Sequence, residues 1–116
     1  MVKVAVLVSG GGTNLQALID EFNLGTINGE IKLVISNRKN AYGLVRAQKA
    51  GIKNMCIKDQ DELLKTLKEE GIELIVLAGY LAIISDELIK EYENRIINIH
   101  PSLIPSFCGM GYYGLH

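Results

Sequence analysis

An amide and an imidazole stand two residues apart in the segment Asn98-Ile99-His100-Pro101. Alternate side chains of a strand lie on one face, so Asn98 and His100 are predicted to share a face. Pro101 favours an extended His100, which carries the alternation to the end of the strand. This pair suits chemistry in which a carbonyl oxygen gains charge and a proton moves. The alternative is a strand-end histidine satisfied by backbone; the adjacent amide and the prolines 101 and 105 favour the chemical interpretation.

A glycine-rich segment, Ser9-Gly10-Gly11-Gly12, lies between an apolar run and a stretch of helical period that begins near Thr13. Glycines let a ligand approach the backbone, and the N–H groups and dipole at a helix start favour an anion. Thr13 and Gln16 have the spacing of a capping box. The segment predicts a phosphate site formed by the residues 10–14, namely Gly10, Gly11, Gly12, Thr13 and Asn14, although a plain tight turn explains the glycines equally well.

Two familiar nucleotide motifs do not fit this glycine segment. The dinucleotide fingerprint needs glycine or alanine where Leu15 stands, and an acidic residue where Ser36-Asn37-Arg38 follows the second predicted strand. The P-loop pattern fails because no Gly-Lys-Ser/Thr follows the glycines. The kind of phosphate ligand therefore stays open at this level.

The third candidate segment runs from Leu77 to Ile84 and is apolar apart from Gly79 and Tyr80. At the end of a strand, such a segment can line a flat hydrophobic pocket. The competing interpretation, which these residues alone favour, is that the segment belongs to the core.

The elements that must position these segments alternate between apolar runs rich in β-branched residues and stretches of helical period. This alternation predicts an α/β fold, with a doubly wound, Rossmann-like and largely parallel sheet. Strands are predicted at residues 2–8, 31–36, 54–57, 73–78 and 95–99. A first helix is predicted to begin near Thr13, with Leu15, Leu18, Ile19 and Phe22 facing inward. A second helix is predicted over 41–50, with Ala41, Leu44, Ala47 and Ala50 on one face. Two more are predicted, one from the Asp59–Glu62 capping box to Gly71 and one over 85–92. Ligands of such sheets bind at the carboxyl ends of the strands, where all three candidate segments fall.

Composition narrows the function classes. With 116 residues, 12 basic and 13 acidic side chains and a net charge of −1, the sequence predicts one domain over residues 1–116 with no basic surface for nucleic acid. The longest uncharged apolar stretch is too short to span a membrane. The isolated Cys56 and Cys108 predict no disulfide framework and no metal site, and a cytoplasmic setting is expected.

Four segments together resemble the phosphoribosylglycinamide formyltransferases, which are folate-dependent enzymes of purine biosynthesis. The segments, in the right order and at the right separations, are Val6 to Gln16, Ser36-Asn37, Leu77-Ala78-Gly79-Tyr80 and Asn98 to Pro105. The resemblance implies transfer of a formyl group from the co-substrate 10-formyltetrahydrofolate to the amine of glycinamide ribonucleotide. It implies small-molecule partners only, no metal, and a monomer or homodimer.

The resemblance also implies roles for individual residues. Asn98 and His100 would stabilise the oxyanion of a tetrahedral intermediate, and His100 would help move the proton. The segment 10–14 would hold the ribonucleotide phosphate, and Gly79 and Pro101 would lie against the glycinamide. The pterin pocket would be lined by Leu77, Leu81, Ile83, Ile84 and Ile96.

The family's third catalytic residue is an aspartate well downstream of the His-Pro-Ser segment, and this sequence ends before it. We therefore expect residues 1–116 to form an N-terminal, phosphate-binding portion of the formyltransferase fold, with low activity alone. The rivals are a formyltetrahydrofolate deformylase-like hydrolase, disfavoured because that enzyme has a second histidine in the place of Pro101, and a noncatalytic phosphate- or nucleotide-binding module. Methionyl-tRNA formyltransferase is disfavoured because it would need a basic surface.

Overall fold

The computed structural model describes residues 1–99 and 110–112 of the chain. In chain order, its elements are β1 (Val2–Val8), α1 (Thr13–Asn23), β2 (Gly29–Ser36), α2 (Tyr42–Lys49), β3 (Lys53–Cys56), α3 (Gln60–Glu69), β4 (Leu74–Ala78), α4 (Asp86–Glu91), β5 (Ile96–Ile99) and β6 (Met110–Tyr112). His100 and Pro101 lie outside the described residues.

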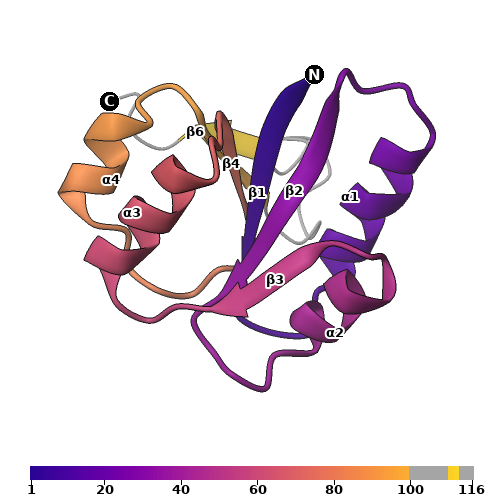
Figure 1. Cartoon of the computed structure of the whole chain (residues 1–116), viewed down its shortest axis with the longest axis horizontal. Coiled ribbons are helices and arrows are strands. Elements are labelled where there is room, and N and C mark those ends of the chain that lie inside the picture. Colours follow the sequence, from indigo (N-terminus) through magenta and orange to yellow (C-terminus); the bar gives the residue numbers. More distant parts are fainter. Residues whose placement is uncertain (100–109, 113–116) are drawn as a thin grey trace.

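The strands form one sheet in the order β3-β2-β1-β4-β5-β6. The first five are parallel, while β6 pairs antiparallel with β5. Helices α1 and α2 lie on one side of the sheet and α3 and α4 on the other (Figure 1). This arrangement confirms the doubly wound, largely parallel sheet. The sixth strand is a difference from the five expected, because Met110-Gly111-Tyr112 is too short to give a pattern of its own.

The sheet is covered by apolar side chains on both faces, which is why its central strands are nearly continuous apolar runs. Under α3 and α4 lies the α3/α4 cluster: Ala5, Leu7, Leu33, Ile35, Ile57, Leu63, Leu67, Ile72, Ile75, Leu77, Ile84, Leu88, Tyr92 and Ile96. Under α1 and α2 lies the α1/α2 cluster: Val4, Val6, Val8, Leu15, Ile19, Val34, Ala47, Val76 and Ala78. Alternate residues of β1 supply both clusters, so this central strand ties the two halves of the core together.

The helix ends follow the predicted signals in part. The side chain of Asp59 accepts from the N–H of Glu62 at 2.9 Å and begins α3, as the capping pattern predicts. Helices α2 and α3 are followed by Gly51 and Gly71, both at positive φ. In each case the next N–H bonds back into the last turn, which is the common glycine termination of a helix.

The predicted capping box at Thr13 is wrong. Helix α1 begins after Gly12, which is in the left-handed region at φ 77°, and no side chain caps it. Thr13 is already the first helical residue, so its hydroxyl is not in the capping position. The Gln16 side chain instead donates to Asp20 and accepts from Arg46. Two smaller differences are that Ala50 is exposed, since it follows the last turn of α2, and that β3 ends at Cys56, one residue early.

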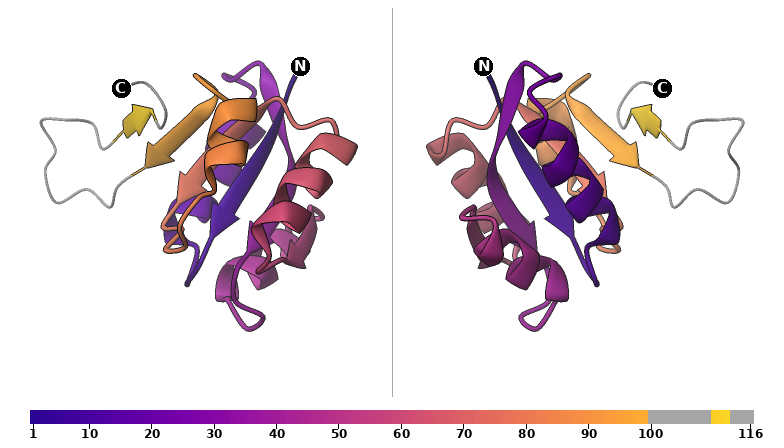
Figure 2. Two further views of the ribbon diagram at one scale, coloured as in Figure 1. Left: turned by 90° about the vertical axis from the view of Figure 1, so that its left-hand side faces the viewer. Right: turned by 90° about the vertical axis from the view of Figure 1, so that its right-hand side faces the viewer.

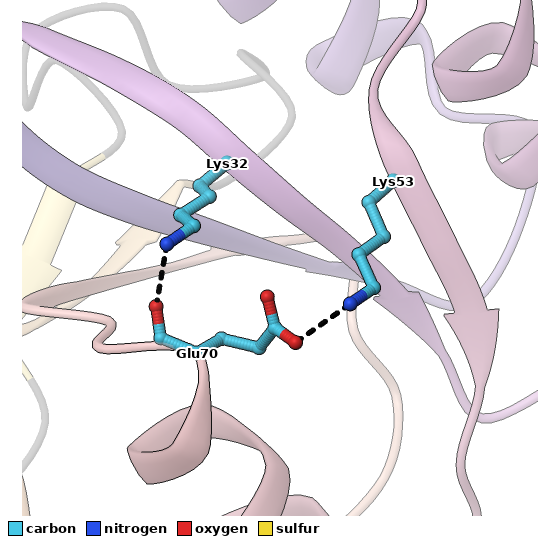
Figure 3. Close-up of polar contacts among 3 residues, drawn as sticks. All are labelled: Lys32, Lys53 and Glu70. Carbon is cyan, nitrogen blue, oxygen red and sulfur yellow. Dashed lines mark hydrogen bonds and ion pairs between the residues drawn. The ribbon is translucent and has the colours of Figure 1, made fainter.

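A register shift in β2 changes the direction of one lysine. Val4 of β1 pairs with Ile31 and Ala5 pairs with Leu33, so Lys32 is an extra residue, as in a β-bulge. Lys32 thereby reaches the end of α3, where its Nζ donates to the carbonyl oxygen of Glu70 at 3.0 Å. Lys53 of β3 binds the carboxylate of the same residue at 2.7 Å, and Figure 3 shows both lysines converging on it.

Candidate functional site

The carboxyl ends of the five parallel strands lie at one edge of the sheet, and three loops and a strand end gather there. They are the glycine loop (residues 9–12) after β1, Asn37 after β2, the β4–α4 loop (residues 79–85), and Asn98 on β5. Figure 2 shows β5 and β6 side by side at one side of the sheet. The fold thus brings the glycine loop, the β4–α4 loop and Asn98 to one edge of the sheet.

A buried serine joins three of these strand ends. Ser9 is only 1% exposed, and its Oγ donates to Oδ1 of Asn37 at 2.5 Å. The same oxygen accepts from the backbone N–H of Leu81 at 2.8 Å. Because Ser9, Asn37 and Leu81 follow β1, β2 and β4, this hydroxyl fixes the glycine loop against the β4–α4 loop.

The glycine loop is also held from α2. The N–H of Gly43 donates to the Gly10 carbonyl at 3.1 Å, and Nε of Arg46 donates to the Gly11 carbonyl at 2.7 Å. A Cβ on Gly12 would lie 2.7 Å from the Cα of Gly43, so this close approach of the two backbones requires glycine at position 12. The loop is therefore fixed through its carbonyl groups.

The backbone N–H groups of the loop glycines donate to no acceptor among the described residues, whereas the loop carbonyl groups do accept hydrogen bonds. Among the described residues, no hydrogen bond is donated by the backbone N–H of Gly10, Gly11 or Gly12. A Cβ on Gly10 or Gly11 would meet nothing within 4 Å, so the loop is open to an approaching group. Donors beside the start of α1 are suited to an anion, and the phosphate site over residues 10–14 stays a prediction.

The β4–α4 loop is held at both ends by one side chain of α3. Oε1 of Gln60 accepts from the N–H of Ser85 at 2.9 Å, and Nε2 lies 3.5 Å from the Tyr80 hydroxyl. Burial raises the pKa of Tyr80, against a smaller opposing contribution from the Gln60 bond, so the phenol is neutral at physiological pH. Gly79 opens the loop at φ 75°, a conformation that glycine adopts readily.

The five residues predicted for a pterin pocket fall into two groups. Leu77, Ile84 and Ile96 are buried in the α3/α4 cluster. Leu81 and Ile83 are 74% and 89% exposed. The core interpretation of the segment 77–84 is therefore right for Leu77 and Ile84 but wrong for Leu81 and Ile83, which are exposed apolar side chains.

Asn98 pairs with Leu77 of β4 and with Gly111 of β6. Its register beside Leu77, and its separation of two from Ile96, place it on the sheet face that α3 and α4 cover. Because His100 lies outside the described residues, the predicted shared face of Asn98 and His100 stays a prediction, as does the placement of Pro101.

Sequence reasoning missed the residues that hold the site together: Ser9 as a connector, Gln60, Gly43 and Arg46. Gly43 and Arg46 stand within a helix of ordinary composition, and their contacts reach residues about 30 positions away, so no local pattern marks them. Ser9 carried a weak signal, since it is a polar residue that directly follows a strand whose last five residues are buried.

No metal or membrane feature is found in the part of the chain that the structure describes. Among residues 1–99 and 110–112, no group of three or more His, Cys, Asp or Glu side chains is placed to hold a metal ion. None of the helices in these ranges combines the length and apolarity needed to cross a bilayer.

Comparison with known proteins places this site in context. The model of a family described as formyl transferase matches residues 2–115. The phosphoribosylglycinamide formyltransferase of Haemophilus influenzae is 43% identical, over 97% of this chain and 58% of its own length. A structure of glycinamide ribonucleotide transformylase 1 from Symbiobacterium toebii superposes with a TM-score of 0.84 at 40% identity, over 92% of this chain and 55% of the other.

A solved formyltetrahydrofolate deformylase from Pseudomonas putida is also similar, with a TM-score of 0.76 at 26% identity, over 85% of this chain and 38% of the other. The chain therefore spans little more than half of the formyltransferase from Haemophilus influenzae and of the transformylase structure.

Proposed function

Because the chain belongs to the formyl transferase family, we propose that it transfers a formyl group from 10-formyltetrahydrofolate to the amine of glycinamide ribonucleotide, a step of purine biosynthesis in the cytosol. The observation that carries the proposal is the extent of the family match. Residues 2–115 include every segment from which the candidate site is built. The names of the relatives from Haemophilus influenzae and Symbiobacterium toebii supply the substrate.

The ribonucleotide phosphate binds at the glycine loop and the start of α1, residues 10–14. Supporting this placement, the N–H groups of Gly10, Gly11 and Gly12 donate to no described residue, while the loop carbonyls are held by α2. The N-terminal end of α1 adds a favourable field for a negative group. The glycinamide then extends toward Gly79 and Pro101.

In the transfer, the amine nitrogen attacks the formyl carbon and a tetrahedral intermediate forms. The bond between that carbon and the folate nitrogen then breaks, and the proton lost by the amine passes to the departing nitrogen. Asn98 and His100 donate hydrogen bonds to the oxyanion, and His100 assists the proton transfer. The position of Asn98 near the carboxyl end of β5 supports this role.

The pterin ring packs in an apolar pocket with two layers. Leu81 and Ile83, which are exposed, contact the ring directly. Leu77, Ile84 and Ile96 are buried in the α3/α4 cluster and line the pocket from the core side. Burial of the two exposed side chains by a planar ligand stabilises the complex through the hydrophobic effect.

The proposal is tested by incubating the purified chain with both substrates and measuring formylated ribonucleotide by mass spectrometry. We expect product above a protein-free control, and a rate that falls about 100- to 1,000-fold in Asn98→Ala and in His100→Ala, as for loss of an oxyanion donor. Lys90→Ala, an exposed change on α4, is the matched control and should keep the rate of the unaltered chain.

Other outcomes decide between the alternatives. Formate without formylated amine would replace the proposal by deformylase-like hydrolysis, which the similarity to the Pseudomonas putida deformylase keeps in view. Ribonucleotide binding without any turnover would favour a phosphate-binding module and refute catalysis by this chain.

A further inference from the structure

Helix α2 holds two consecutive carbonyl groups of the glycine loop, and this has a consequence for the N–H groups that follow them. A trans peptide is planar, and its C=O and N–H point in opposite directions. Fixing the Gly10 carbonyl toward the Gly43 N–H therefore aims the Gly11 N–H away from α2. Fixing the Gly11 carbonyl toward Arg46 aims the Gly12 N–H in the same way.

The contact from Arg46 depends on the shape of its side chain. Nε donates to the Gly11 carbonyl at 2.7 Å, while Nη1 lies 3.4 Å from Oε1 of Gln16 in α1. A planar guanidinium can reach two acceptors in fixed directions, whereas a lysine ammonium is a single point on a flexible chain. Arg46 thus joins the loop to the first turn of α1 at a defined angle.

The guanidinium of Arg46 also contacts the aromatic ring of Tyr42. Its central carbon lies 5.1 Å from the centre of the Tyr42 ring, one turn earlier in α2, which is a cation–π distance. Lys49 lies over the same ring at 5.7 Å and donates to the Tyr42 hydroxyl at 3.3 Å, but none of its described contacts reaches the loop. The helix therefore offers two cations on one aromatic ring, of which only Arg46 touches the glycine loop.

We propose that Arg46 is a positioning residue for anion binding: it fixes the Gly11 carbonyl so that the glycine-loop N–H groups face the phosphate of the substrate. The identity of the ligand as a phosphate rests on the proposed function, but the orientation of the loop N–H groups does not. Arg46 acts here through the shape of its guanidinium, so another positively charged side chain without that shape does not replace it. Gly43 has a supporting part, since its own N–H holds the Gly10 carbonyl.

The test compares Arg46→Lys, which keeps the charge and loses the two-acceptor geometry, with Lys49→Met, which removes a charge from the same helix face. Binding of inorganic phosphate and of glycinamide ribonucleotide to the full chain is followed by NMR, together with the amide shifts of Gly11 and Gly12 without ligand. We expect Arg46→Lys to weaken both ligands about tenfold, as for loss of a bond from a charged donor, and to move both amide signals. Lys49→Met should change neither the affinity for the two ligands nor the Gly11 and Gly12 amide shifts.

A readout without ligand separates this inference from the proposed function. If the unaltered chain binds no phosphate while Arg46→Lys still moves the Gly11 and Gly12 amides, the phosphate site fails and the positioning stands. If affinity and amide shifts both survive Arg46→Lys, the positioning role is refuted. A second variant, Gln16→Met, keeps the test valid if Arg46→Lys folds poorly, because it removes only the acceptor of Arg46 Nη1. It should shift the Gly11 and Gly12 amide signals by a smaller amount. Unchanged amide signals in Gln16→Met would count against the proposal.

Discussion

At the scale of single residues, Gly12 and Gly10 of the glycine loop differ in how strictly the structure requires glycine. Gly12 has φ 77°, and a Cβ there would lie 2.7 Å from the Gly43 backbone, so its requirement is structural. We expect Gly12→Ala to lower the free energy of unfolding by about 2–4 kcal/mol, from left-handed strain and backbone crowding together. Gly10→Ala meets no atom within 4 Å and should leave stability within about 0.5 kcal/mol. Urea denaturation of both variants measures this difference; equal losses would contradict it.

The candidate chemistry-bearing residues can be singled out in the sequence, whereas the residues that support them cannot. Asn98 and the glycine loop stand out because strand ends in a parallel sheet collect ligands, and both segments follow apolar runs. The links made by Ser9, Gln60 and Arg46 span 20 or more residues and depend on which loops the fold brings into contact. Side chains with no distinctive local pattern carry no sequence signal for such contacts.

At the scale of elements, the end of α3 is tied to the sheet by a group of charges. Hydrogen bonding to Lys53 is the main cause that lowers the pKa of Glu70 from its ordinary value of 4.5. Desolvation opposes it, and the charges of Lys53 and Lys32 lower the pKa further. A lowered pKa in the folded state means that ionised Glu70 stabilises the fold above its unfolded pKa. This stabilisation disappears as the pH falls through the lowered pKa.

The substitution Glu70→Gln should therefore reduce stability at neutral pH and have almost no effect in acid. We expect the difference in unfolding free energy from the unaltered chain to be largest near pH 7 and to shrink as the pH falls below 4.5 and through the lowered pKa, as measured by urea denaturation from neutral to acidic pH. Glu69→Gln, an exposed change on the same helix with no ion pair among the described residues, is the control. A difference that stays constant with pH would show that the Glu70 carboxylate does not act through ionisation.

Element prediction succeeded where one local signal decides the outcome. Gly51 and Gly71 end their helices at positive φ, and Asp59 begins α3 through its side chain. It failed at α1, where Thr13 and Gln16 matched a capping pattern but the close contact between Gly12 and α2 set the start of the helix. Strand β6 was missed because a three-residue strand is defined by its partner β5 and has no periodicity to detect.

At the scale of the whole molecule, the site lies where the two halves of the core meet. The glycine loop follows β1 and leads into α1, over the α1/α2 cluster, whereas Asn98 and the β4–α4 loop lie toward the α3/α4 cluster. Strand β1 contributes alternate residues to both clusters, and the Ser9 hydroxyl joins the loops above them. Because these elements share a central strand, we expect the two sides to unfold together.

This coupling is testable by weakening one side and observing the other. Leu67→Ala in α3 and Leu15→Ala in α1 each remove a side chain that is 0% exposed, at an expected cost of about 2–5 kcal/mol. If the clusters form one cooperative unit, either variant lowers hydrogen-exchange protection equally in α1 and α3, measured by mass spectrometry. Leu24→Ala, at a side chain 69% exposed, is the control and should lower neither. Protection lost only in the substituted helix would show that the two clusters open independently.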